Sequence, residues 1–157
     1  MAGPEVGQAA PDIELARDDG TPLKLASLRG KPVVVYFYPQ DDTETCTVEA
    51  IEFSRLLPEF GKLGAVVVGI SPDSAKSHAK FRKKHDLKVD LASDEDRRII
   101  EAYGLWGEKQ MFGRKYMGVE RATFLIGPDG RIAEVWRKVR VKGHAEAVLA
   151  AVKTLKA

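Results

Sequence analysis

The chain of 157 residues contains one cysteine and lacks several features that define other classes of protein. A single thiol excludes an internal disulfide and cannot by itself build a structural zinc site. No apolar run reaches the roughly 18 residues that a bilayer crossing needs, so we expect no membrane partner. The formal net charge of +2 is too small to indicate a nucleic-acid partner. No Gly-x-Gly-x-x-Gly or phosphate-binding loop is present, which argues against a nucleotide cofactor.

The composition is that of a soluble globular protein. Charged residues make up 31% of the chain and the hydrophobic class 44%. This length and composition predict one domain over residues 1–157. Residues 1–7 lack the basic and apolar regions of a signal peptide, and the lone cysteine has no partner for a disulfide. We therefore expect a reducing compartment, the cytoplasm.

The apolar pattern predicts an α/β protein. Residues 13–16 and 23–25 alternate around an Asp-Asp-Gly turn, which predicts an amino-terminal β-hairpin. Further strands are expected at 33–38, 65–70, 89–91, 122–126 and 132–136, and helices from Thr43 to about 60, from 74 to about 86, from 94 or 95 to 103, and from 144 to 155. Pro58 should kink or end the first helix. Residues 104–118 hold four glycines and no apolar period, so they are predicted as a long loop.

This order of elements predicts the architecture. Parallel crossovers are followed by a closing antiparallel hairpin, which gives a central mixed β-sheet flanked by helices. In such sheets functional sites lie at the carboxyl ends of strands, and Cys46 comes just after one of them.

Cys46 occupies a position that favours a reactive thiol. Pro39 ends the apolar strand, Asp41 and Asp42 mark a turn, and Asp42 or Thr43 can cap the helix in whose first turn Cys46 lies. Unpaired helix N–H groups and the positive end of the helix dipole both stabilise a thiolate there. The alternative is a small buried hydrophobe, which is common for a lone cysteine. Polar neighbours at positions 45, 47 and 49 argue against it.

The same stretch resembles the peroxiredoxin family. Pro39-x-x-x-Thr43-x-x-Cys46 is similar to the family signature Pro-x-x-x-Thr/Ser-x-x-Cys. Tyr-Phe-Tyr-Pro at 36–39, with Asp-Asp-Thr at 41–43, looks like the bacterioferritin-comigratory, or Q, branch. Residues 7–12, 25–31, 120–126 and 135–144 also resemble segments of that branch. The resemblance runs nearly from end to end.

The resemblance implies a thioredoxin-like fold and a peroxidase that reduces hydrogen peroxide and organic hydroperoxides without metal, haem or flavin. Cys46 would be the nucleophile and would form a sulfenic acid. An ordinary thiol with a pKa near 8.5 is about 3% ionised at pH 7. A pKa of about 6 would raise that fraction roughly thirtyfold, which is modest beside enzymatic accelerations. Most of the rate must therefore come from holding the peroxide and stabilising the leaving oxygen.

Three other residues acquire roles from this resemblance. Arg121 corresponds to the family arginine and would face both the sulfur and the peroxide. The Thr43 hydroxyl would donate to one peroxide oxygen and accept from the other. Pro39, which has no N–H, would shield the thiolate from water. From the residues alone, Thr43 could equally be a plain helix cap, and Arg121 a solvated charge at the start of a strand.

The chain departs from its branch in one important respect. The branch often carries a second cysteine five residues after the nucleophile, where this chain has Ile51, or on the next helix, where residues 81–84 contain none. A one-cysteine cycle follows, in which an outside thiol such as thioredoxin, glutaredoxin or glutathione reduces the sulfenate. Glu44 and Thr45 replace the Pro-Gly common before the nucleophile. We expect a monomer, with a weak dimer as the alternative.

The remaining polar residues suggest no further chemistry. His78, His85 and His144 lack ligand spacing and are predicted to lie on the surface. A turn and a helix cap explain Asp41 and Asp42 more simply than a metal does. The alternative function is a non-enzymatic redox sensor or binding module, which would oxidise once and would not turn over.

Overall fold

The structure, a computed structural model, describes residues 3–155. Over this range the strands are β1 (Glu14–Arg17), β2 (Pro22–Lys24), β3 (Val33–Phe37), β4 (Val66–Ser71), β5 (Asp90–Ser93), β6 (Trp106–Met111), β7 (Arg114–Val119), β8 (Ala122–Ile126) and β9 (Ile132–Trp136). The helices are α1 (Glu44–Lys62), α2 (Ala75–His85), α3 (Arg98–Ala102) and α4 (His144–Thr154), with a short 3-10 helix η1 (Leu25–Leu28).

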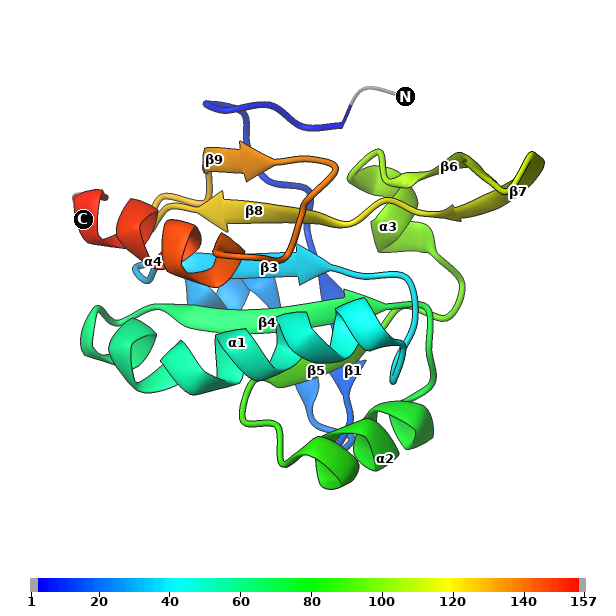
Figure 1. Ribbon diagram of the computed structural model, residues 1–157. Coiled ribbons are helices and arrows are strands. Elements are labelled where there is room, and N and C mark those ends of the chain that lie inside the picture. Colours follow the sequence, from blue (N-terminus) through cyan, green and yellow to red (C-terminus); the bar gives the residue numbers. More distant parts are fainter. Residues whose placement is uncertain (1–2, 156–157) are drawn as a thin grey trace.

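A seven-stranded sheet in the order β2-β1-β5-β4-β3-β8-β9 forms the centre of the fold. β3 pairs in parallel with β4, and β4 with β5, whereas the other pairs are antiparallel. Helices α1 and α4 cover one face of the sheet and α3 covers the other (Figure 1). This is the mixed sheet flanked by helices that the order of elements predicts. The predicted amino-terminal hairpin is also present as β1 and β2.

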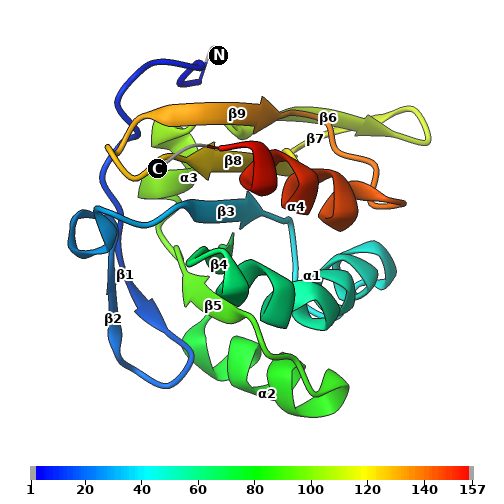
Figure 2. The same cartoon turned by 90° about the vertical axis from the view of Figure 1, so that its left-hand side faces the viewer.

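The central strand β3 is buried on both faces, which fixes the position of the residues that follow it. Every residue of β3 is buried, and successive side chains alternate between two apolar clusters. Val34 and Tyr36 pack under α1 and α4, whereas Val35 and Phe37 pack on the α3 side. The carboxyl end of β3, from which the chain turns into α1 (Figure 2), is therefore packed on both faces.

Helix α1 continues through Pro58, so this proline does not end the helix, which is one of the two predicted outcomes. The helix reaches Lys62 and buries Phe53 and Phe60 against the sheet. This burial offsets the backbone hydrogen bond that the proline removes. In contrast, α3 begins later than predicted, at Arg98. No helix within residues 3–155 combines the length and the apolar character that a membrane crossing needs.

Residues 104–118 are not a long loop, as the sequence pattern suggests, but contain most of the hairpin β6–β7. The two central residues of its turn, Phe112 and Gly113, both have positive φ, at 51° and 76°, as a type I′ hairpin turn requires. Most side chains of β7 are exposed, so no apolar alternation marks the strand in the sequence. The hairpin matters because its second strand leads directly to Arg121.

Candidate active site

The structure brings Cys46 and Arg121 together although 75 residues separate them. Cys46 lies in the first turn of α1, just beyond the carboxyl end of β3, and is 1% exposed. Arg121 precedes β8, in which Ala122 lies opposite Phe37 at the end of β3. The antiparallel pairing of β8 with β3 thus places the guanidinium at the start of α1, and Nη2 donates to Sγ of Cys46 at 3.2 Å.

The other terminal nitrogen of the same guanidinium binds Glu49. Nη1 of Arg121 donates to Oε1 of Glu49 at 2.7 Å, and the carboxylate is 1% exposed. Burial raises the pKa of Glu49 to about 7, although Arg121 acts in the opposite direction. Sequence reasoning treats Glu49 only as a polar neighbour of the thiol. Its spacing of three residues from Cys46 is the signal that places both side chains on one helix face.

A second cation lies on this side of the molecule. Lys109 of β6 donates from Nζ to the carbonyl of Val119 at 2.8 Å. Burial lowers the pKa of Lys109, Arg121 lowers it further, and Cys46 and Glu120 act in the opposite direction. The loop predicted for residues 104–118 gives Lys109 no fixed place, whereas the β6–β7 hairpin holds its ammonium on the Val119 carbonyl, two residues before Arg121.

Thr43 and Pro39 flank the thiol along the chain. Thr43 occupies the N-cap position of α1, but its side chain makes no capping hydrogen bond. Its Oγ instead donates to the carbonyl of Gln40 at 3.1 Å. Pro39 is half-buried and joins β3 to the turn. Glu44 stays exposed in the first turn of α1, where its carboxylate is favourable for the helix dipole.

The prediction that the histidines lie on the surface is wrong for two of the three. His78 is fully buried and His144 is 6% exposed. Each buried ring has a polar partner that a distant element supplies, and no sequence spacing marks such a partner. For His144 it is the hydroxyl of Thr123, 2.8 Å from Nε2. Burial, with a smaller effect of Arg121, lowers the pKa of His144 to about 4, so the ring is neutral at neutral pH.

Asp41 and Asp42 do not cap α1, contrary to expectation. Asp41 is buried and binds residues of α2, and Asp42 pairs with Lys84 and His85. Asp41, Asp73 and His78 place ligand atoms within 4.8 Å of one another, as a metal site would. The oxygens involved, however, already accept hydrogen bonds from protein hydroxyl and N–H groups, so hydrogen bonding accounts for the cluster.

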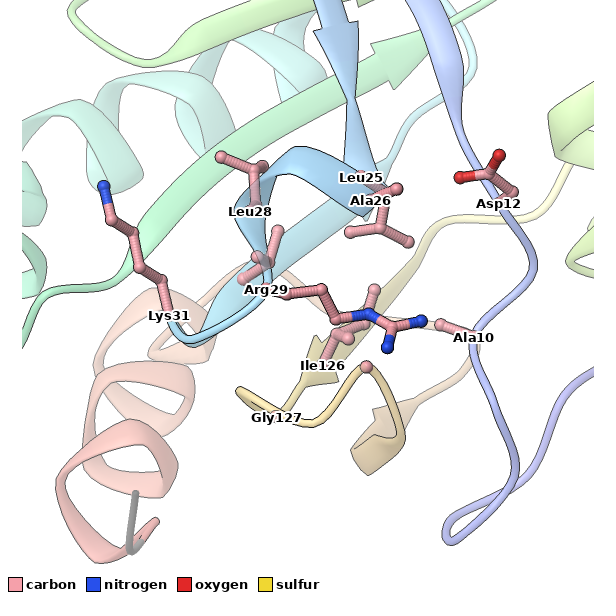
Figure 3. A pocket seen from close by; sticks show the side chains of 11 residues that line it. Ala10, Asp12, Leu25, Ala26, Leu28, Arg29, Lys31, Ile126 and Gly127 are labelled. Atoms are coloured by element: carbon pink, nitrogen blue, oxygen red, sulfur yellow. The ribbon is translucent and has the colours of Figure 1, made fainter.

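A separate cavity of about 260 Å³ lies at the other end of β3, lined in part by Val33, Arg29 and Asp12 (Figure 3). It is remote from the thiol, which follows the opposite end of the strand. The chemistry of this protein is therefore concentrated where β3 meets α1.

A buried thiol at a helix start, with a guanidinium on its sulfur and a mixed sheet beneath it, defines a class: thiol-dependent peroxidases on the thioredoxin-like fold. The comparisons with known proteins agree with this class. The AhpC/TSA family matches residues 6–135. Peroxiredoxin Bcp of Bacillus subtilis (strain 168) is 47% identical over 152 residues, which cover 97% of this chain and 95% of that protein. Peroxiredoxin Bcp of Xanthomonas campestris is 45% identical over 149 residues, covering 95% and 93%.

Solved structures give the same answer. The bacterioferritin comigratory protein of Xanthomonas campestris, whose structures were analysed for alkyl peroxide reduction, aligns with a TM-score of 0.88 at 42% identity, covering 95% of this chain and 98% of that one. PrxQ of Xylella fastidiosa aligns with a TM-score of 0.92 at 38% identity, covering 98% of both. The chain belongs to the AhpC/TSA family and is a peroxiredoxin of the Bcp or Q type. The thioredoxin-like fold and the peroxidase class implied by the sequence motifs are confirmed, and peroxides and thiol reductants are its partners in general.

Proposed function

We propose that this peroxiredoxin works by a one-cysteine cycle, with Cys46 as the nucleophile that attacks the peroxide. The observation that carries the proposal is the contact between Arg121 and the Cys46 sulfur at 3.2 Å. A permanent cation at this distance stabilises the thiolate, which is the nucleophilic form. It also stabilises negative charge that moves from sulfur to the leaving oxygen as the O–O bond breaks.

The chemical step converts a thiolate and a hydroperoxide into a sulfenic acid and an alcohol, or water when the substrate is hydrogen peroxide. A lone pair of the Cys46 sulfur forms the S–O bond to the terminal peroxide oxygen while the O–O bond breaks. The leaving oxygen departs with the electron pair and takes a proton from solvent, which replaces the proton that the Cys46 thiol released when it ionised. The sulfur is oxidised by two electrons and the peroxide is reduced by two.

Thr43, Pro39 and the helix amides position the substrate in this proposal. The Thr43 hydroxyl donates to the Gln40 carbonyl, so its oxygen can accept from the peroxide O–H. The donation from Thr43 to the other peroxide oxygen, which the resemblance implies, requires the hydroxyl to exchange the Gln40 carbonyl for the substrate. Amide groups in the first turn of α1, including that of Cys46, have no partner from a preceding turn and can donate to the peroxide. Pro39 adds a side chain without a competing N–H donor.

An external thiol must complete the cycle because the chain has one cysteine. A first thiol attacks the sulfenic sulfur, releases water and forms a mixed disulfide, and a second thiol reduces that disulfide to regenerate Cys46. Thioredoxin, glutaredoxin and glutathione are the candidate reductants, and we propose that the enzyme works in a reducing compartment, the cytoplasm, where these thiols occur. We take a monomer as the working unit, because Cys46, Arg121 and Glu49 all come from one chain.

The test follows the Cys46 thiol during the reaction. Reduced protein is mixed with one equivalent of hydrogen peroxide or of an alkyl hydroperoxide in a stopped-flow instrument, and the remaining thiol is titrated. We expect stoichiometric loss of the thiol at a rate far above that of free cysteine, and no reaction in Cys46→Ser. Oxidation no faster than that of free cysteine would refute the proposal.

Turnover separates the enzyme from a redox sensor. Peroxide consumption is measured with glutathione, with glutathione plus glutaredoxin, and with thioredoxin plus its reductase. A one-cysteine peroxidase consumes many equivalents with at least one of these systems, and mass spectrometry then finds a mixed disulfide on Cys46. A sensor would oxidise once and stop.

A further inference from the structure

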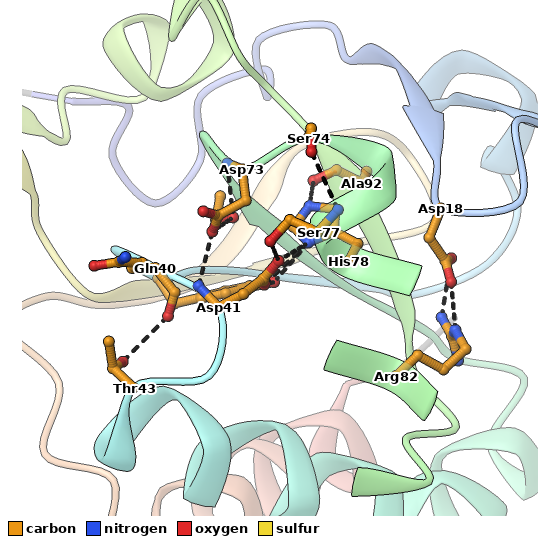
Figure 4. Close-up of polar contacts among 12 residues, drawn as sticks. Asp18, Gln40, Asp41, Thr43, Asp73, Ser74, Ser77, His78, Arg82 and Ala92 are labelled. Carbon is orange, nitrogen blue, oxygen red and sulfur yellow. Dashed lines mark hydrogen bonds and ion pairs between the residues drawn. The ribbon is translucent and has the colours of Figure 1, made fainter. Parts of the chain in front are cut away.

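A buried polar network joins the segment before the Cys46 helix to helix α2 (Figure 4). Asp41, in that segment, is 9% exposed, and its carboxylate accepts from the hydroxyls of Tyr38 and Ser77, each at 2.7 Å. Nδ1 of His78, on α2, lies 2.7 Å from Oδ2 of the same carboxylate. The His78 ring is 0% exposed, so solvent does not take part in these contacts.

The partners of the His78 ring determine its protonation. Nε2 lies 3.0 Å from the carbonyl of Ala92, which can only accept, so Nε2 carries a proton. Nδ1 faces the Asp41 carboxyl, and a proton must lie between them at this distance. Burial raises the pKa of Tyr38, which remains a phenol and donates to Asp41 rather than supplying charge. Both ring nitrogens thus face oxygen atoms, Nδ1 the Asp41 carboxyl and Nε2 the Ala92 carbonyl, which is the arrangement that a ring with two N–H donors would fill.

The same segment is anchored at two further points. The backbone N–H of Asp41 donates to Oδ2 of Asp73 at 2.7 Å, and that oxygen also accepts from the Ser71 hydroxyl at 2.6 Å. Asp42 adopts a φ of 61° and pairs with two residues of α2, but it is 40% exposed. Exposed pairs of this kind contribute little, whereas a buried pair is costly to break. The His78–Asp41 pair is therefore the dominant link.

We propose that His78 is a positioning residue of the peroxidase reaction: it is held as an imidazolium and, through Asp41, it orients the Pro39–Thr43 segment and the first turn of α1 around the Cys46 sulfur. The proposal rests on the function proposed above. Reaction requires the peroxide oxygen to meet the sulfur in line, and a displacement of about 1 Å can cost about a hundredfold in rate. A helix start fixed to α2 by a buried ion pair meets this requirement.

The test compares the same substitution at two histidines of one helix. His78→Leu removes the two ring nitrogens that contact Asp41 and Ala92, whereas His85→Leu removes the contact with the exposed Asp42 and replaces one apolar neighbour of Phe81 by another. We expect peroxide oxidation of Cys46 to slow by about 10- to 100-fold in His78→Leu and by less than about twofold in His85→Leu. Alkylation of Cys46 by iodoacetamide should not slow in His78→Leu, because the thiol remains and only the peroxide geometry is lost.

A spectrum tests the protonation of the His78 ring, and a conservative variant tests whether its contact with Asp41 sets the oxidation rate. In the wild-type protein, ¹⁵N NMR should show both ring nitrogens of His78 protonated at neutral pH. Asp41→Asn retains the shape of the side chain, and its amide can donate to a neutral ring. We expect this variant to oxidise within about fivefold of the wild-type rate and to show one protonated ring nitrogen. If His78→Leu fails to fold, Ser77→Ala, which removes one donor to Asp41, should slow oxidation about two- to fivefold.

Several results would overturn the proposal. These are a singly protonated His78 in the wild-type protein, a folded His78→Leu variant that oxidises at the wild-type rate, and equal slowing of peroxide oxidation and alkylation. Slow oxidation of Asp41→Asn in a folded protein would do the same. Failure of the proposed function is distinguishable, because the wild-type thiol would then react with peroxide no faster than free cysteine does.

Discussion

Replacing Glu49 with glutamine should change the pH dependence of stability in a defined direction. Glu49 is 1% exposed and has one partner, Arg121, for Oε1. Within the described residues Oε2 has no hydrogen-bond partner. Burial of this half-satisfied carboxyl raises its pKa from 4.5 to about 7.

The sign follows from proton binding in the two states. Between pH 4.5 and about 7 the folded protein keeps a proton on Glu49 that the unfolded chain has already released. The free energy of unfolding therefore falls as the pH rises through this window, and the loss is complete above the folded-state pKa. This difference between the folded-state and unfolded-state pKa of Glu49 lowers the free energy of unfolding by about 3 kcal/mol in total. About 2.5 kcal/mol of that loss falls between pH 5 and pH 8. Glu49→Gln abolishes this loss.

Urea unfolding of the two proteins at pH 5, 6, 7 and 8 measures the effect. Both should carry Cys46→Ser, so that neither oxidation nor ionisation of the thiol contributes. Other groups, including His144, titrate in both proteins and cancel in the comparison. We expect the glutamine variant to gain about 2.5 kcal/mol relative to its parent on going from pH 5 to pH 8.

A stability difference that stays constant across this range would refute the reasoning, because it would mean that Glu49 is ionised in the folded protein throughout. A folded-state pKa at or below 4.5 gives this nearly constant difference between pH 5 and pH 8, so that result would mean that Arg121 offsets or outweighs burial. The result also bears on catalysis, since an ionised Glu49 shares the charge that Arg121 offers to the sulfur.

Two further substitutions test the site and the helix that carries it. Arg121→Gln is combined with Glu49→Gln, so that no buried carboxylate is left unpaired, and Glu49→Gln alone is the control. The double variant should oxidise at Cys46 about 10²- to 10³-fold more slowly than the control in stopped-flow measurements. A loss of rate below about threefold would contradict the role of the guanidinium. Pro58→Ala should raise the free energy of unfolding by about 1–3 kcal/mol in urea titrations. Pro58 is exposed within α1 and lacks the backbone N–H that alanine would contribute to the helix. A variant that is less stable but equally active would contradict this prediction.

The sequence predicts the frame of this site because local signals specify it. The apolar run of β3, the proline that follows it and the helix period after Thr43 place Cys46 at the start of α1 without any knowledge of packing. The motif around Cys46 and the segment around Arg121 also identify the family. The predicted pairing of the two residues follows from that resemblance, and the antiparallel contact of β3 with β8 provides it.

The tertiary structure alone decides which polar side chains are buried. In the sequence, nothing distinguishes Glu49, His78 and His144 from residues on a solvent-exposed helix face. Glu49 and His78 do lie on helices whose opposite face is exposed to solvent. What buries them is a partner from a distant part of the chain: Arg121 for Glu49, Asp41 for His78 and Thr123 for His144. The sequence by itself determined the fold class, the family and the position of Cys46 at the start of α1, because these rest on local pattern and on resemblance. The charges that surround the thiol were decided only by folding, because burial depends on contacts between segments that no spacing along the chain records.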